Sequence, residues 1–88
     1  MAPATKPVVL CFSGHDPSGG AGIQADIETI VSHQCHAANV ITALTDQDTS
    51  NVKKMRPQPA AEIISQARTI LEDLPVKAIK IGLIGSLR

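Results

Sequence analysis

Aromatic side chains are almost absent from this sequence, because Phe12 is the only one among 88 residues. Proteins that bind single-stranded nucleic acid stack its bases on aromatic rings, so this scarcity argues against that function. An excess of charge of one sign is lacking as well, since eight basic and eight acidic side chains cancel. A balanced chain has no electrostatic footprint for nucleic acid or for an anionic membrane surface. We expect neither as a partner.

Long apolar runs and a set of paired cysteines are also missing. No run approaches the about 20 residues of a transmembrane helix. The apolar run at residues 8–12 is too short for the core of a secretory signal and leads directly into a glycine-rich stretch. Cys11 and Cys35 are too few for a disulfide framework and are expected to be reduced thiols. These absences favour a cytoplasmic protein.

Glycine, in contrast, is concentrated in one stretch. Four of the six glycines lie in residues 13–22, which read SGHDPSGGAG. They follow an apolar run at residues 7–12, which predicts a parallel strand covered on both faces. They precede residues 21–34, which predict a helix with Ser18 as its N-cap and with Asp26 away from the apolar face. The apolar residues at helical spacing are Ile23, Ile27, Ile30 and Val31.

The rest of the chain continues this alternation. Residues 37–44 are apolar and β-branched and predict a second strand, and residues 52–55 favour a short strand within a polar segment. Pro57 and Pro59 end the extended segment and open a second helix. Its apolar face is Ile63, Ile64, Ala67, Ile70, Leu71 and Leu74. Residues 76–84 predict a third strand. The order predicts an α/β fold, with helices packed on a mainly parallel sheet joined by right-handed crossovers.

The glycine-rich stretch is placed at the carboxyl end of the first predicted strand, which is the edge where open α/β sheets bind ligands. The helix that follows presents free N–H groups and a partial positive charge to the same place. The stretch lacks the lysine of a P-loop and the spacing of a GxGxxG motif. From the pattern alone two interpretations stay open. The glycines either let a ligand approach the backbone, or only allow the turn and close packing of helix and strand.

Three segments together resemble one known family. They are SGHDPSGGAGIQADIET at residues 13–29, VITALTDQDT at residues 40–49 and IKIGLIGS at residues 79–86. They resemble the hydroxymethylpyrimidine/phosphomethylpyrimidine kinases of thiamine biosynthesis, in the family's order and spacing, and the likeness covers residues 7–87. The resemblance implies a ribokinase-like fold, a three-layer α/β/α sandwich. It also implies transfer of phosphate from ATP to 4-amino-5-hydroxymethyl-2-methylpyrimidine and then to its monophosphate.

The resemblance also implies a set of substrate-binding residues. Gly14 and Asp26 match positions at the family's pyrimidine pocket, and Gln47 matches the glutamine that pairs with the edge of the ring. Thr45 and Leu83 match positions that shape the pocket walls. A carboxamide suits an aminopyrimidine, because it offers one donor and one acceptor side by side. A pocket built this way rejects analogues that leave its polar groups unpaired.

Each of these residues also has a plain structural explanation. Asp26 in the first turns of a helix fits a solvated carboxylate favoured by the helix dipole. His15 fits either a phosphate ligand or an exposed turn residue. The run HQCH at residues 33–36 invites a zinc site, but a second ligand pair is lacking and we expect no metal there. Asp48 stands where many relatives of the family have asparagine, and its charge lies beside Gln47.

The family's kinases are about three times as long as this chain, so residues 1–88 are expected to be the N-terminal part of a single, incomplete kinase domain. The resemblance places the catalytic base, the anion hole and the ATP and Mg²⁺ sites beyond residue 88, so this chain alone is expected to be inactive. We expect it to form a homo-oligomer or to associate with the missing remainder. Two other functions stay open: part of a pyridoxal kinase, or a pyrimidine-binding module without catalysis.

Overall fold

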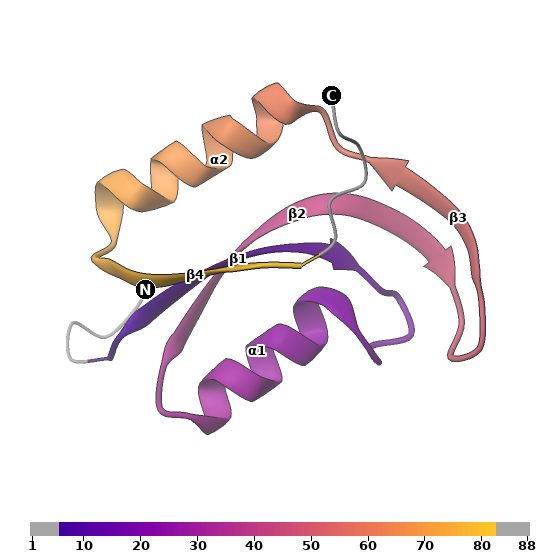
Figure 1. Ribbon diagram of the computed structural model, residues 1–88, viewed down its shortest axis with the longest axis horizontal. Coiled ribbons are helices and arrows are strands. Elements are labelled where there is room, and N and C mark those ends of the chain that lie inside the picture. Colours follow the sequence, from indigo (N-terminus) through magenta and orange to yellow (C-terminus); the bar gives the residue numbers. More distant parts are fainter. Residues whose placement is uncertain (1–5, 83–88) are drawn as a thin grey trace.

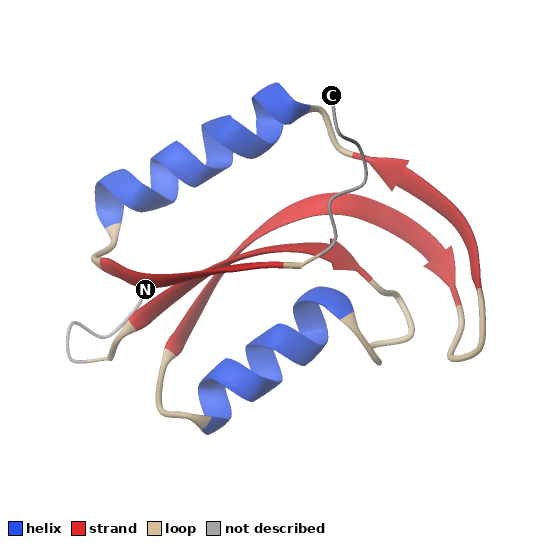
Figure 2. Ribbon diagram, viewed as in Figure 1, coloured by secondary structure: helices blue, strands red, loops and turns tan. Residues whose placement is uncertain are grey.

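A four-stranded sheet lies between two helices in the computed structural model, which describes residues 6–82 (Figures 1 and 2). The strands are β1 (Val8–His15), β2 (His36–Gln47), β3 (Val52–Pro57) and β4 (Val76–Ile81), and the helices are α1 (Gly22–Ser32) and α2 (Ala60–Asp73). The strand order is β3-β2-β1-β4. β1 pairs in parallel with β2 and β4, whereas β3 runs antiparallel to β2. The predicted α/β class and mainly parallel sheet are confirmed.

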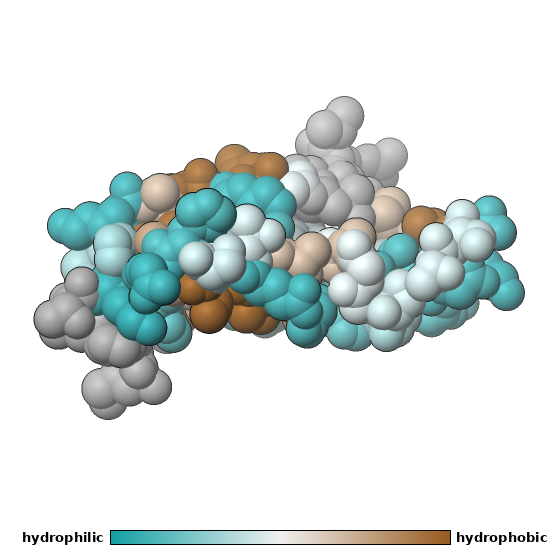
Figure 3. Space-filling view, turned by 90° about the horizontal axis from the view of Figure 1, so that it is seen from below, coloured by the Kyte–Doolittle hydropathy of each residue, from teal (hydrophilic) through white to brown (hydrophobic). Residues whose placement is uncertain are grey.

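The apolar core lies between the sheet and α2. Val8 and Leu10 of β1 and Val40 of β2 are fully buried there, with Ala38 beside them. Residues two apart in a strand share a face, so the side chains of Val8 and Leu10 both point toward α2. Partly buried side chains complete this core: Phe12, Ile63, Ala67, Ile70, Leu74 and Val76. α1 covers the opposite face, where hydrophilic residues predominate on the outside and hydrophobic surface shows only in patches (Figure 3).

The helical faces are narrower than the sequence predicts. Ile64 and Leu71 of α2 and Val31 of α1 are exposed, although all three were expected on an apolar face. Each sits at the margin of its apolar stripe, one position beyond the residues that reach the sheet. α1 also begins at Gly22 and ends at Ser32, shorter at both ends than the predicted residues 21–34. Within residues 6–82 no helix is long and apolar enough to cross a membrane.

Three strands are longer than predicted, and two of them, β1 and β2, continue into polar sequence. β1 continues past Phe12 through His15, and β2 continues past Leu44 through Gln47. The reason is pairing: Gly14 and His15 lie beside Ala43 and Leu44, while Thr45 to Gln47 pair with β3. The short strand predicted at residues 52–55 is confirmed as part of β3. The third predicted strand is confirmed as β4, and its residues 83 and 84 lie outside the described residues.

Leu10→Ala is expected to lower the free energy of unfolding by about 2–5 kcal/mol, because it leaves a cavity under α2. Leu71→Ala is the matched control, since Leu71 is 50% exposed while Leu10 is 0% exposed. This control is expected to cost less than about 1 kcal/mol. Chemical denaturation of both variants measures the difference, and equal losses would contradict this placement of the core.

Candidate functional site

A cavity of about 320 Å³ opens at the carboxyl ends of β1, β2 and β4. Residues from these strands, from β3, from the glycine-rich loop and from the start of α1 line it. Gly14, Thr45 and Gln47 are among the lining residues, so three of the five predicted site residues come together. Asp26 lies next to the cavity without lining it, and Leu83 is outside the described residues. This is the edge at which parallel sheets are expected to bind ligands.

Gly22 brings the start of α1 against the end of β1. Its φ is +62°, and a Cβ at this position would lie 2.2 Å from the carbonyl oxygen of Gly14. His15 and Gly22 also form an isolated bridge. Only glycine accommodates both the positive φ and the approach of the two backbones. Gly22 therefore serves close packing of helix and strand, which is one of the two interpretations left open by the sequence, and it also lines the cavity.

Asp16 organises the glycine-rich loop. Its Oδ1 accepts hydrogen bonds from the amide (2.8 Å) and hydroxyl (2.6 Å) of Ser18, and its Oδ2 accepts from the amide of Gly20 (3.1 Å). The Ser18 hydroxyl, followed by backbone amides, lowers the pKa of Asp16. The predicted N-cap at Ser18 is wrong: Ala21 occupies that position without a side-chain cap, because Ser18 is bonded to Asp16 instead.

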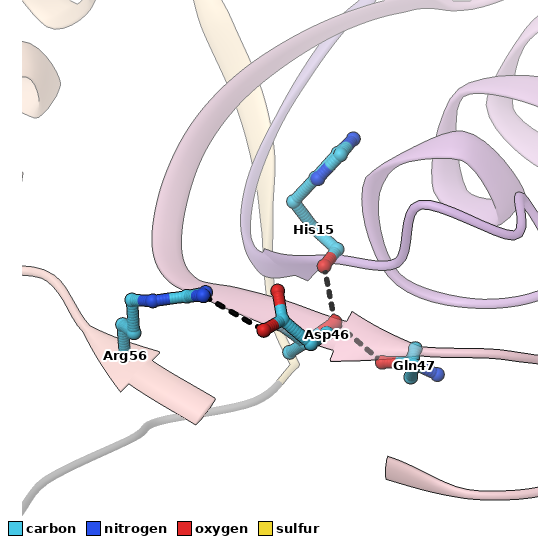
Figure 4. Close-up of polar contacts among 5 residues, drawn as sticks. His15, Asp46, Gln47 and Arg56 are labelled. Atoms are coloured by element: carbon cyan, nitrogen blue, oxygen red, sulfur yellow. Dashed lines mark hydrogen bonds and ion pairs between the residues drawn. The ribbon is translucent and has the colours of Figure 1, made fainter. Parts of the chain in front are cut away.

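Thr45 and Gln47 form a polar pair where β2 ends, and Figure 4 shows Gln47 beside His15 and Asp46. The Thr45 hydroxyl lies 2.7 Å from the His15 carbonyl oxygen and 2.7 Å from Gln47 Oε1. A hydroxyl has one hydrogen and can serve one acceptor at a time. Within residues 6–82 no partner is recorded for Gln47 Nε2, so this amide keeps two donors and Oε1 keeps a lone pair. The Thr45 hydroxyl is thus within hydrogen-bonding distance of one side of the carboxamide, and the Nε2 donors lie on the other side.

Asp26 is the buried residue of α1 and is 8% exposed, so it is not a solvated helix carboxylate. Its two oxygens accept hydrogen bonds from the Ser13 hydroxyl of β1 and from the Lys80 ammonium of β4. Ser13 and Lys80 both line the cavity. Burial, followed by the negative charge of Asp26, raises the pKa of the neighbouring Cys11 thiol. The carboxylate therefore meets the cavity through two other side chains.

Sequence reasoning missed Ser13, Lys80 and Gly82, all of which line the cavity. Ser13 and Gly82 lie in the quoted motifs but carry no charge that singles them out. Lys80 lies opposite Cys11 in the sheet, and Cys11 is two residues before Ser13 in β1. The side chains of Cys11, Ser13 and Lys80 therefore lie on the same face of the sheet.

Two nearby carboxylates belong to the β2–β3 hairpin rather than to the cavity. Asp48 Oδ1 accepts from the amides of Ser50 and Asn51, both at 2.8 Å, which lowers the pKa of Asp48. Asp46 pairs with Arg56 at 2.8 Å, and both side chains are exposed (Figure 4). Such a surface pair contributes at most about 1 kcal/mol. In the described part of the chain, which includes the HQCH run at residues 33–36, no three His, Cys, Asp or Glu side chains are close enough together to hold a metal ion.

Comparisons with known proteins point in one direction. The sequence model of the family described as phosphomethylpyrimidine kinase matches residues 16–88. A hydroxymethylpyrimidine/phosphomethylpyrimidine kinase of Streptomyces coelicolor is 38% identical over 96% of this chain and 31% of its own length. The crystal structure of phosphomethylpyrimidine kinase from Clostridium difficile 630 matches with a TM-score of 0.85 and 40% identity, covering 92% of this chain and 35% of that one.

A pyridoxal kinase structure from Bacillus subtilis, in complex with ADP, is also similar. It matches with a TM-score of 0.83 and 29% identity, over 93% of this chain and 33% of its own. These structural neighbours are kinases of the ribokinase-like type, as the motifs predict. The chain spans about a third of the length of these relatives.

Gly22→Ala is expected to lower the free energy of unfolding by about 2 kcal/mol or more, because a positive φ is strained for alanine and the new Cβ meets the Gly14 carbonyl. Gly20→Ala is the matched control: a Cβ there would lie 3.6 Å from the nearest neighbouring atom, with no positive φ. This control is expected to change stability by less than about 0.5 kcal/mol. Thermal unfolding compares the two variants, and equal effects would contradict the close approach.

Proposed function

The chain belongs to the phosphomethylpyrimidine kinase family, and on this premise we propose that its cavity is the acceptor side of a kinase active site. The proposed reaction transfers phosphate from ATP to hydroxymethylpyrimidine and then to its monophosphate, in thiamine biosynthesis. The observation that carries the proposal is the convergence of Gly14, Thr45 and Gln47 on one cavity at the carboxyl edge of the sheet. These residues come from two strands and are more than 30 positions apart at the extremes.

Gln47 is proposed to pair with the edge of the pyrimidine. Its free donors and acceptor match a ring nitrogen beside an exocyclic amine, and its bond to Thr45 fixes the carboxamide before the ligand arrives. Gly14 is buried in β1 where the register with β2 shifts, and without a side chain it allows the flat ring to approach the backbone. Asp26 is proposed to act as a positioning residue, because both its oxygens hold side chains that line the cavity.

ATP and Mg²⁺ are proposed as phosphate donor and metal of the complete kinase, where they supply the phosphoryl group and neutralise its charge. The residues described here do not fit a magnesium site. Asp16 and Asp26, the acidic residues at the cavity, are each held by hydrogen bonds within the chain. No group of three potential ligands occurs within residues 6–82. We therefore assign this chain to the acceptor side alone and expect it to be inactive as an isolated kinase.

A pyridoxal kinase is the second candidate, favoured by the structural likeness to pyridoxal kinases. Pyridoxal is also a flat heterocycle with a hydroxymethyl group, so the same cavity suits its general shape. The higher identity to the phosphomethylpyrimidine kinase structure, 40% against 29%, places the pyrimidine first. A pyrimidine-binding module without catalysis would make the same contacts with the pyrimidine as the proposed kinase, but it would not phosphorylate it.

Gln47→Ala is expected to weaken hydroxymethylpyrimidine binding about 10-fold or more, because two hydrogen bonds to the ring edge are lost. Gln24→Ala is the matched control, since Gln24 is exposed on α1 and its side-chain amide donates to Glu28 Oε1 on the same helix. Calorimetry on the intact protein measures both variants. Pyridoxal is titrated in parallel: tighter pyridoxal binding would favour the second candidate, and binding of neither ligand would contradict the proposal.

The β4 edge is proposed to associate with further protein, either a second copy or the remaining part of a longer kinase. Ile79 and Ile81 lie beside Leu10 and Phe12 in the sheet, on the side of the core, yet both are exposed. Within residues 6–82, β4 has one neighbouring strand, so its outer edge offers unpaired backbone groups.

The 88-residue chain alone is therefore expected to run above its monomer mass, and Ile81→Lys is expected to reduce that mass. A charge on an edge strand opposes pairing. Light scattering during size-exclusion chromatography measures both proteins, with Lys77→Gln on the same strand as the control. A clean, stable monomer of the wild-type chain would contradict the proposed association.

A further inference from the structure

We propose that Lys80 binds the phosphate group of the phosphorylated acceptor and thereby distinguishes the monophosphate from the alcohol. This inference rests on the proposed function, because it concerns how one cavity accepts two ligands that differ by a phosphate. It assigns a ligand-binding role to a residue of β4 that is 54 positions from its partner Asp26 in the sequence.

The Lys80 ammonium is held in place and still has capacity for a ligand. It donates to Asp26 Oδ1, and the side chain of Asp26 is 9% exposed whereas that of Lys80 is 52% exposed. An ammonium carries three hydrogens, and the described residues provide one acceptor for it. Two donors therefore remain on a lysine that lines the cavity. The buried carboxylate fixes where the positive charge sits.

Lys80 is the one ammonium or guanidinium group among the described residues that line the cavity. Ala21 and Gly22 at the start of α1 line the same cavity, where the helix dipole adds a partial positive charge. Asp16 also lines the cavity, and hydrogen bonds that lower its pKa keep its carboxylate negatively charged. Lys80 is therefore the group in the described lining that can pair with an anion by charge.

Gly82 keeps the approach to Lys80 open. A Cβ at this position would lie 3.3 Å from Ser13 Oγ and 3.8 Å from Lys80 Nζ. Any side chain there would cover the ammonium and the hydroxyl from the cavity side. Glycine at position 82 thus leaves the Lys80 ammonium uncovered, although the φ of Gly82 requires no glycine.

Hydroxymethylpyrimidine and its monophosphate differ in the strength of the hydrogen bond that each accepts from Lys80. A phosphate oxygen makes a charge-assisted hydrogen bond with an ammonium, which is about twice as strong as a neutral one. The hydroxymethyl oxygen of the alcohol accepts a hydrogen bond without charge. Removing the charge at position 80 is therefore expected to weaken monophosphate binding about 10-fold or more, and alcohol binding less than about 3-fold.

The test is calorimetry on the intact protein without nucleotide, with hydroxymethylpyrimidine and hydroxymethylpyrimidine monophosphate as the two probes. Lys80→Gln removes the charge and keeps a donor for Asp26, and Lys80→Arg keeps the charge. Lys77→Gln removes an exposed charge from the same strand and is the control for long-range electrostatics. The wild-type protein is also titrated between about 50 mM and about 500 mM KCl, because salt weakens charge pairs and leaves the alcohol largely unaffected.

The inference predicts a selective loss of monophosphate affinity in Lys80→Gln, retention of most of it in Lys80→Arg, and no change in Lys77→Gln. It also predicts that salt lowers the affinity of the wild-type protein for the monophosphate alone. Equal losses for both ligands, or no loss for the monophosphate, would overturn it. A wild-type protein that binds the alcohol and not the monophosphate overturns the role of Lys80 and leaves the proposed function standing. Binding of neither ligand overturns the proposed function itself.

Discussion

A buried carboxylate is the constraint on which this site depends. Asp26 is the buried residue of α1, and a charge removed from water is costly unless other groups bond to it. Ser13 of β1 and Lys80 of β4 supply those bonds, so one side chain ties a helix to two neighbouring strands. The Lys80 side chain is 52% exposed whereas that of Asp26 is 9% exposed, so removing either partner of Asp26 would leave a buried carboxylate with one fewer bond. The same contact that joins α1 to the sheet sets the polar wall of the cavity.

The opposite wall depends on backbone rather than on charge. Gly22 lets α1 begin directly against the Gly14 carbonyl, and the loop between them is held by Asp16. β2 then extends far enough to place Thr45 and Gln47 across from this loop. The carboxamide of Gln47 and the ammonium of Lys80 give the lining of the cavity two kinds of polar group. That combination suits a small heterocycle that carries a phosphate.

Alternating strands and helices were predictable because apolar runs and helical spacing are local properties of the sequence. The extents of β1 and β2 were not, because polar residues such as Ser13 and Thr45 join a strand only when partners from elsewhere pair with them. Asp26 illustrates the same limit. Helical spacing put it on a polar face, and only contacts from β1 and β4 explain its burial. Gly14 and Gln47 could be proposed from the motifs, whereas Lys80 was overlooked although it lies in the motif IKIGLIGS, because its pairing with Asp26 spans 54 positions.

A crystal structure of the intact protein with hydroxymethylpyrimidine bound tests the central claim most directly. The account predicts that the ring lies against Gly14, that its amine and ring nitrogen are within hydrogen-bonding distance of the Gln47 carboxamide, and that Asp26 remains bonded to Ser13 and Lys80. A ring bound away from this cavity, or an Asp26 that leaves both partners to bind the ligand directly, would contradict it.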